Sequence, residues 1–253
     1  MTTLQEIETT PPKPIAPVPS QNRLLRALPP DEYARISLQL HAVSMKAKQV
    51  FHRQGEPIRD VYFPGGGACS LVKVMRDGSV AEIATVGSEG MLGAGVFFGD
   101  DLSTGEALVQ VSDGEAHTMP AGAFIQEMER RGDFYNRITR YSQAFTTQIM
   151  QTTVCNGLHS AEERCCRWLL MTHDRVRQHE FGLTHEGLAV MLGVRRPTVT
   201  LIAAKLQAAG LISYRRGYIT IVDRPGLEKA SCECYETVKA NFRRLLPELP
   251  PMG

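Results

Sequence analysis

One segment, residues 183–207, limits most strongly what this chain can fold into. It reads LTHEGLAVMLGVRRPTVTLIAAKLQ, with apolar residues at helical spacing on both sides of Gly193. Thr184 can cap a first helix, because its hydroxyl accepts a hydrogen bond from an amide with no intrahelical partner. Gly193 permits a tight turn, and Pro197 is tolerated in the first turn of a second helix. The segment therefore predicts a helix-turn-helix.

The residues that follow predict a two-stranded wing. Residues 210–222 read GLISYRRGYITIV, in which two strand-like runs flank Arg215, Arg216 and Gly217. Arg195 and Arg196 lie at the exposed start of the second helix, a placement that an ordinary helical hairpin would not explain. Because positive charge and a helix that fits the major groove occur together, the pattern predicts DNA binding. The candidate DNA-binding residues are Arg195, Arg196, Thr198, Thr200, Lys205, Arg215 and Arg216.

Charge divides the chain into an acidic and a basic region. The net charge of the 253 residues is only +1, so the whole chain should not be strongly attracted to nucleic acid. Residues 159–222, however, carry nine Lys or Arg against five Asp or Glu, whereas residues 77–129 carry ten Asp or Glu and no Lys or Arg. We expect the two regions to have separate roles.

Residues 50–120 predict an all-β unit. Short apolar or alternating runs such as ACSLVKV and VAEIATV are separated by glycines that can occupy turns. This rhythm is typical of a compact barrel or roll. The glycine-rich residues 90–99 match neither G-x-G-x-x-G nor a phosphate loop, so we expect no dinucleotide or triphosphate site there.

Residues 134–156 contain neither Pro nor Gly and predict a long helix. Apolar residues along it repeat at about seven-residue spacing, which suits pairing with a second helix. Packing of the same helix against its own β unit explains the stripe equally well, and both interpretations remain open. The candidate dimer-helix residues are Ile138, Tyr141, Phe145, Ile149 and Thr152.

The ends of the chain and the cysteines suggest an intracellular protein. Residues 1–10 lack the basic start and apolar run of a signal peptide, and no stretch is apolar enough to span a membrane, so we expect a cytoplasmic location. The six cysteines are too sparse for a disulfide scaffold. Cys165-Cys166 and Cys232-x-Cys234 lack the C-x-x-C spacing common at zinc sites. We expect reduced, mostly packed thiols and no metal site.

Together these features resemble the Crp/Fnr superfamily of bacterial transcription regulators. The resemblance covers residues 22–222 and rests on T184-H-E-G-L-A-V-M-L-G-V-R-R-P-T-V-T with its wing and on G87-S-E-G-M-L-G. It implies an α+β fold, in which a cyclic-nucleotide-binding-like β-roll (a jelly roll) and a long dimerisation helix precede a C-terminal winged helix-turn-helix. The expected domains are a flexible Pro-rich tail (1–21), the β-roll sensor (22–133), the dimerisation helix and hinge (134–158), the winged helix-turn-helix (159–222) and a C-terminal helical extension (223–253).

The resemblance also implies partners. Family members dimerise along the long helix and place the second helix of each motif in a major groove of a palindromic site. The implied partners are double-stranded DNA, a second copy of the chain and RNA polymerase, with no membrane. Arg196 falls where the family commonly has a guanine-reading arginine, whereas Pro197 and Leu201 replace polar residues. The target DNA sequence, and whether the chain activates or represses, stay open.

The effector site departs from the family pattern. Members that bind cyclic nucleotides hold the ribose with a Gly-Glu pair and the phosphate with an Arg-Ser/Thr pair, which here fall at Gly93-Ala94 and Gly105-Glu106. A buried phosphate needs a cation or converging amides, and residues 77–129 offer His117 alone. We therefore expect no cofactor and a degenerate pocket that does not bind cyclic AMP in the usual mode. The identity of any effector stays open. Its candidate residues are Gly90, Met91, Leu92, Gly93, Ala94, Gly105 and Glu106.

Other classes of function fit less well. An iron-sulfur sensor of the fumarate-nitrate type needs an N-terminal cysteine cluster, but the first cysteine is Cys69. Haem would need a ligand such as His41, His52 or His117, and a lone histidine is more often a hydrogen-bonded surface or core residue. No catalytic residues are expected, because no triad, paired metal ligands or phosphate loop occurs in a supporting context. The remaining alternative is an effector-binding module that regulates a protein partner.

Overall fold

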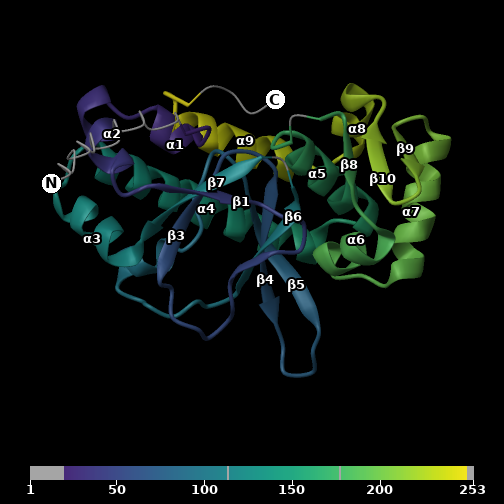
Figure 1. Cartoon of the computed structure of the whole chain (residues 1–253). Coiled ribbons are helices and arrows are strands. Elements are labelled where there is room, and N and C mark those ends of the chain that lie inside the picture. The colour runs from purple at the N-terminus through teal and green to yellow at the C-terminus, as the bar shows by residue number, and fades with distance from the viewer. Residues whose placement is uncertain (1–19, 113, 177, 250–253) are drawn as a thin grey trace, which may run out of the picture.

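The computed structural model describes residues 20–112, 114–176 and 178–249. Most of the predicted flexible tail therefore lies outside the described residues. The expected α+β architecture is confirmed: an antiparallel β-roll, a long helix and a winged helix-turn-helix follow one another along the chain. Figure 1 shows the roll and the winged domain side by side.

The β-roll consists of two antiparallel sheets. One has the order β1-β7-β3 and the other β2-β6-β4-β5. In β6, alternate residues Ala107, Val109 and Val111 are buried, as expected for a strand with one face on a core. The strands are β1 (His41–Ser44), β2 (Val50–His52), β3 (Asp60–Pro64), β4 (Ala68–Val74), β5 (Val80–Val86), β6 (Glu106–Val111) and β7 (Glu115–Pro120).

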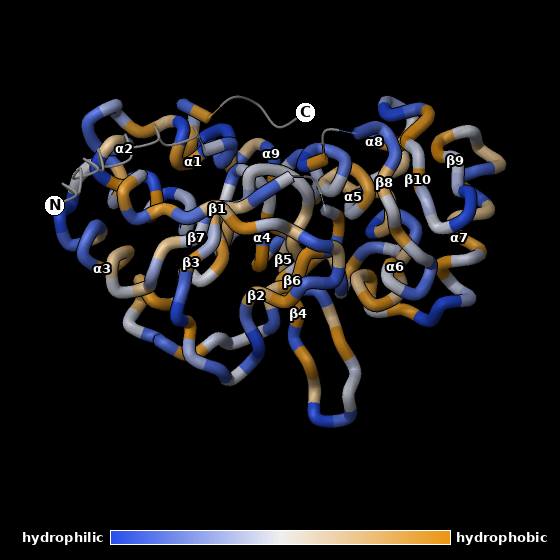
Figure 2. The backbone as a smooth tube through the Cα atoms, in the orientation of Figure 1, coloured by the Kyte–Doolittle hydropathy of each residue, from blue (hydrophilic) through white to orange (hydrophobic). Residues whose placement is uncertain are grey.

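Short helices flank the roll. They are α1 (Arg23–Arg26), α2 (Pro30–Ser37), the 3-10 helix η1 (Ala94–Phe98) and α3 (Ala121–Glu129). The apolar side chains of the first helix, Leu24 and Leu25, are fully buried against the roll. Figure 2 shows the contrasting hydrophilic tip of the β4–β5 hairpin, which projects away from this core.

Helix α4 (Asp133–Leu158) closes the open side of the roll. Ile138 and Tyr141 are buried in the core of their own domain, so packing on the β unit, one of the two interpretations left open by the sequence, describes these two residues. The Tyr141 hydroxyl donates a hydrogen bond of 3.0 Å to the Met91 carbonyl. Thr152 is also buried, whereas Phe145 and Ile149 are half-buried.

The winged domain begins at α5 (Ala161–His173), whose start is fixed by a capping box between Ser160 and Glu163. Its three-stranded sheet has the order β8-β10-β9. The remaining elements are β8 (Glu180–Gly182), α6 (His185–Leu192), α7 (Arg196–Ala208), β9 (Ile212–Arg215) and β10 (Tyr218–Ile221).

The C-terminal extension folds back along the molecule. It forms α8 (Arg224–Ala230), which contacts α5, and α9 (Cys234–Leu245), which packs mainly against α4. Helix α8 therefore lies on the winged domain, while α9 follows α4 toward the β-roll (Figure 1). An ion pair of 2.8 Å between Arg137 and Glu248 holds the end of this segment.

Buried polar contacts join the acidic roll to the basic winged domain. Glu89, in the turn after β5, pairs with Arg175 at 2.6 Å, and both side chains are at most 2% exposed. In β5 itself, the Glu82 carboxylate accepts a hydrogen bond of 2.6 Å from Trp168 Nε1 on α5. The two domains are therefore fixed to each other by specific contacts between oppositely charged or hydrogen-bonding partners.

Candidate nucleic-acid interface and effector cavity

Helices α6 and α7 form the helix-turn-helix that the sequence predicts. They meet at 107°, within the range of about 90–120° typical of the motif. The Thr184 hydroxyl caps α6 by accepting a hydrogen bond of 3.0 Å from the Gly187 amide. Gly193 ends that helix with φ of 63°, a left-handed conformation that suits glycine.

No single helix of the described chain is long and apolar enough to cross a membrane. Among the described residues, only the bent pair of α6 and α7, taken together, has the length and apolar composition of a membrane span.

The inner faces of both helices are buried, which leaves the start of α7 exposed. Val199, Ile202 and Leu206 pack inward, whereas Arg195, Arg196 and Thr200 point to solvent. Thr198 is half-buried. Because the first amides of a helix have no intrahelical partner, this end of α7 offers backbone donors as well as two cations.

His185, at the start of α6, supports this exposed end of α7. Its Nδ1 lies 3.0 Å from Thr200 Oγ1, and its ring stacks on Tyr214 of β9 with centroids 4.3 Å apart. Partial burial, followed by the charge of Arg196, lowers the pKa of His185, which favours the neutral form of the ring. The sequence pattern did not single out His185, since its contacts join three separate elements, α6, α7 and β9.

The wing carries its two arginines at a tight turn. Tyr218 pairs with Arg215 across the hairpin, so Arg216 and Gly217 form a two-residue loop. Both loop residues have positive φ, 51° and 84°, as a type I′ turn requires. Both arginines are exposed. An arginine in this conformation is unfavourable compared with Asn or Gly, which points to a role for its charge.

Lys205 lies apart from the other candidates. Its ammonium pairs at 2.7 Å with Glu162 of α5, which offsets its charge. Arg164, which the sequence did not single out, donates a hydrogen bond of 2.8 Å to the Leu192 carbonyl at the end of α6. A cation there is favourable because the last carbonyls of a helix carry partial negative charge.

A cavity of about 250 Å³ lies between the roll and α4, where the family resemblance places an effector. Of the candidate pocket residues, Met91, Leu92, Gly93 and Ala94 line this cavity. Gly90, Gly105 and Glu106 do not: Gly90 faces Tyr141, where a Cβ atom would approach the ring to 2.6 Å, and Gly105 faces the Val72 carbonyl at the same distance. These two glycines serve close packing, which sequence spacing cannot distinguish from ligand contact.

The lining of this cavity is apolar. Among the described residues that line it, none is Lys, Arg, Asp or Glu. The polar groups are His52, from the roll, and the hydroxyls of Ser142 and Thr146 on α4, together with Ser103 and Thr104. Burial lowers the pKa of His52, whose Nε2 lies 2.8 Å from the Asp60 carbonyl. The cavity therefore offers no permanent positive charge to a phosphate.

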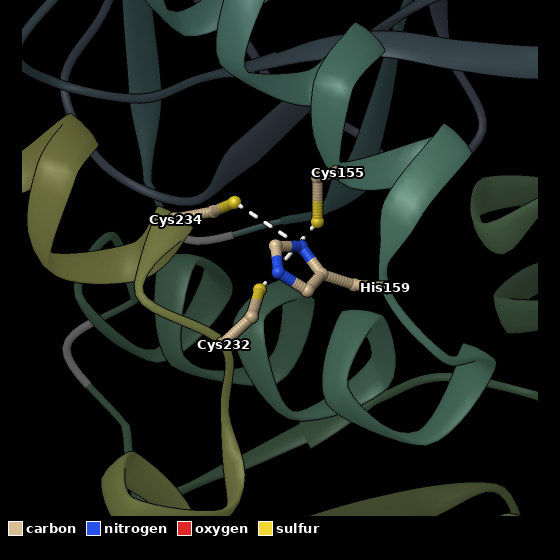
Figure 3. A group of neighbouring side chains, drawn as sticks. All are labelled: Cys155, His159, Cys232 and Cys234. Carbon is tan, nitrogen blue, oxygen red and sulfur yellow. Dashed lines mark hydrogen bonds between the residues drawn. The ribbon is translucent and has the colours of Figure 1, made fainter.

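A second group of reactive side chains lies at the far end of α4. Cys155, His159, Cys232 and Cys234 bring their ligand atoms within 4.8 Å of one another (Figure 3). All six cysteines of the chain are free and buried. Spacing in the sequence argued against a metal site at Cys232-x-Cys234. The missed signal is a second pair in a distant segment, Cys155-x-x-x-His159.

The fold and the exposed start of α7 define a protein that joins a β-roll to a winged helix-turn-helix. Residues 42–131 match the cyclic nucleotide-binding domain, and residues 163–230 match the Crp-like helix-turn-helix domain. The chain belongs to the Crp/Fnr superfamily of transcription regulators. A search of the curated proteins finds no match.

Solved structures show the same fold. A CRP-family transcriptional regulator from Thermus thermophilus is 18% identical, with a TM-score of 0.62, over 76% of this chain and 96% of its own. The regulator CLP of Xanthomonas campestris, described as responsive to c-di-GMP, is 16% identical, with a TM-score of 0.62, over 75% of this chain and 97% of its own. FixK2 from Bradyrhizobium japonicum is 15% identical, with a TM-score of 0.63, over 76% of this chain and 98% of its own.

Proposed function

We propose that this regulator binds a palindromic DNA site as a homodimer, acting in the cytoplasm with RNA polymerase as a partner. The observation that carries the proposal is the exposed start of α7. There Arg195, Arg196 and Thr200 lie on the same motif as the wing arginines, Arg215 and Arg216. A helix end with free amides and cations beside a basic hairpin can read a major groove and hold the flanking phosphates.

The test begins with selection of a preferred duplex from a random library by the wild-type protein. Binding of that duplex and of a scrambled one is then measured for Arg196→Ala. Loss of a base contact costs about 1–3 kcal/mol on the selected site and leaves the scrambled duplex little affected. Arg76→Ala, an exposed arginine near the tip of the β4–β5 hairpin, is the matched control and should bind as wild type.

Two results would contradict DNA recognition by α7. One is an equal loss on both duplexes for Arg196→Ala, which would make that residue a phosphate contact only. The other is failure of the wild-type protein to enrich any palindromic site. That second result would favour an effector-binding module that regulates a protein partner.

For the effector, we propose a neutral, largely apolar small molecule rather than a cyclic nucleotide bound in the usual mode. The apolar lining of the cavity supports this, because a buried phosphate without a cation loses its hydration uncompensated. Calorimetry with cyclic AMP and cyclic GMP should show no binding tighter than about millimolar, equivalent to about 4 kcal/mol. Micromolar affinity for either nucleotide would overturn this part of the proposal.

A further inference from the structure

Three thiols and one imidazole converge where α4 ends. Cys155 lies in the last turn of α4, and His159 is the residue that follows the end of this helix, where its amide donates a hydrogen bond of 3.1 Å to the Cys155 carbonyl. Cys232 lies between α8 and α9, and Cys234 is the first residue of α9. Figure 3 shows the four side chains pointing toward a common centre from these two segments.

The spacing of the ligand atoms fits one tetrahedral metal ion. The Sγ atoms of Cys155 and Cys232 are 3.5 Å apart, and the Sγ atom of Cys234 is 3.5 Å from His159 Nδ1. Zinc–sulfur bonds of about 2.3 Å and zinc–nitrogen bonds of about 2.0–2.1 Å place tetrahedral ligands about 3.6–3.8 Å apart. Small side-chain movements would therefore complete such a site.

Neighbouring groups orient the ligands in the way that zinc sites require. His159 Nε2 lies 3.2 Å from the Glu233 carboxylate, so this nitrogen carries the proton and Nδ1 presents its lone pair to the thiols. Gln151 Nε2 donates a hydrogen bond of 3.0 Å to Cys234 Sγ. A hydrogen bond to sulfur favours the thiolate, the form that binds metal.

Charge and burial also fit a metal centre. Cys155 and Cys234 are fully buried, and the His159 side chain is only 16% exposed. Zinc with three thiolates and one neutral imidazole has a net charge of about −1. Arg167, itself 6% exposed, brings a buried positive charge close to Cys155. Its guanidinium has long contacts of 3.4 and 3.5 Å to the Thr152 hydroxyl, and its Nε has no hydrogen-bond partner among the described residues.

We propose that Cys155, His159, Cys232 and Cys234 bind one Zn²⁺ ion. Binding displaces the thiol protons, with each thiolate donating an electron pair, and no redox step is involved. The ion would join the end of α4, next to the start of α5 at Ser160, to the segment that opens α9. Zinc thereby anchors the C-terminal extension beside the hinge between the sensor and the winged domain.

A disulfide between Cys155 and Cys232 is the main competing interpretation. It would require the sulfurs to approach from 3.5 Å to about 2.05 Å, and it would use only two of the four groups. The convergence of Cys234 and of an imidazole oriented by Glu233 would then have no explanation. A single ion accounts for all four groups, so the geometry favours metal.

The first experiment measures metal in tag-free, full-length protein purified with a thiol reductant. Elemental analysis should find about one zinc per chain. Replacement by Co²⁺ should give the intense visible and near-ultraviolet absorption of tetrahedral cobalt thiolates. Cys232→Ser should lower the zinc content at least about tenfold. Cys165→Ser, a buried cysteine outside the group, should retain it.

A second measurement on wild-type protein guards against misfolding of the variants. In native protein, alkylation of Cys155, Cys232 and Cys234 should be slow and should accelerate at least about tenfold when a chelator removes the metal, while Cys165 stays protected. Mass spectrometry of peptides locates each modification. The proposal is overturned if wild-type protein holds no stoichiometric zinc and gives no cobalt-thiolate absorption. A disulfide between Cys155 and Cys232 in the protein as purified, before any chelator is added, would also overturn it.

Discussion

At the residue scale, two side chains sit in environments that disfavour them. Glu82 accepts hydrogen bonds from Ser70, Thr85 and Trp168, yet desolvation still raises its pKa. Arg216 occupies a left-handed conformation that Asn or Gly adopts more easily. Glu82 lies where the roll meets the winged domain, and Arg216 lies at the tip of the wing. Substitution of either residue should therefore change the stability of the protein.

For Glu82 we predict a stability change with pH that Glu82→Gln removes. Since the folded-state pKa is raised, the contribution of Glu82 is fully present below its unfolded pKa of about 4.3 and is lost as pH rises through the folded value. Wild-type protein should therefore gain stability relative to Glu82→Gln as pH falls from 7 toward about 4.5. Urea denaturation across this range measures the difference, and parallel curves would refute it.

For Arg216 we predict that Arg216→Asn stabilises the protein by up to about 1 kcal/mol, because Asn tolerates positive φ. The same change should weaken binding to all duplexes and reduce the salt slope by about 1, since a phosphate contact is lost. Arg215→Asn is the matched control: it lies in β9 and should weaken DNA binding without stabilising the hairpin. Unchanged DNA affinity for Arg216→Asn would show that the strained position has no role in binding.

At the element scale, α4 presents different faces to different neighbours. Ile138 and Tyr141 face the core, and half-buried Phe145 and Ile149 line the cavity. Further along, Met150, Val154 and Leu158 are 64%, 47% and 78% exposed at a spacing of four residues. An apolar stripe with this spacing suits a second helix, so we propose that the dimer contact runs along it and reaches Phe145 and Ile149 at the cavity.

We accordingly predict that Val154→Asp converts a dimer to a monomer, because it would bury an unpaired charge between two helices. Val154 tests the dimer contact more directly than Phe145 does, because Val154 does not line the cavity. Met75→Asp, at an equally exposed apolar residue in the β4–β5 hairpin, should leave the assembly unchanged. Sedimentation velocity decides: a folded Val154→Asp protein that still dimerises would place the contact elsewhere.

At the scale of the whole molecule, the buried pair of Glu89 and Arg175 joins the sensor to the DNA-binding domain. A ligand or metal that shifts either domain must act against this contact. The pair therefore helps to fix the relative arrangement of the two domains. An ion pair at an exposed position would contribute much less.

We predict that Arg175→Met destabilises the folded protein by about 3–5 kcal/mol, because it leaves the buried Glu89 carboxylate without its ionic partner. The exposed pair of Lys205 and Glu162 is the comparison: Lys205→Ala should cost less than about 1 kcal/mol. Denaturant unfolding with probes in both domains measures the loss. A cost for Arg175→Met no larger than that for Lys205→Ala would mean that the buried pair contributes little.

The local elements of this protein are encoded in short stretches of its sequence. Thr184, Gly193 and Pro197 specify a capped helix, a tight turn and a second helix within a few residues, and Gly217 helps to specify the wing turn. Residues 77–129 contain no Lys or Arg, so the part of the cavity lining that they supply carries no cation. Such features are predictable because hydrogen bonds at helix ends, backbone conformation and local charge depend on neighbours along the chain.

Which distant groups meet depends on how the elements pack against one another. This packing brings Cys155 to Cys232 and Glu89 to Arg175, and it assigns Gly90 and Gly105 to close packing rather than to the cavity. It also separates the faces of α4, which a heptad pattern could not do because packing on a sheet and pairing with a helix call for the same apolar spacing. Contacts between residues far apart in sequence depend on how whole elements pack, and no local pattern encodes that arrangement.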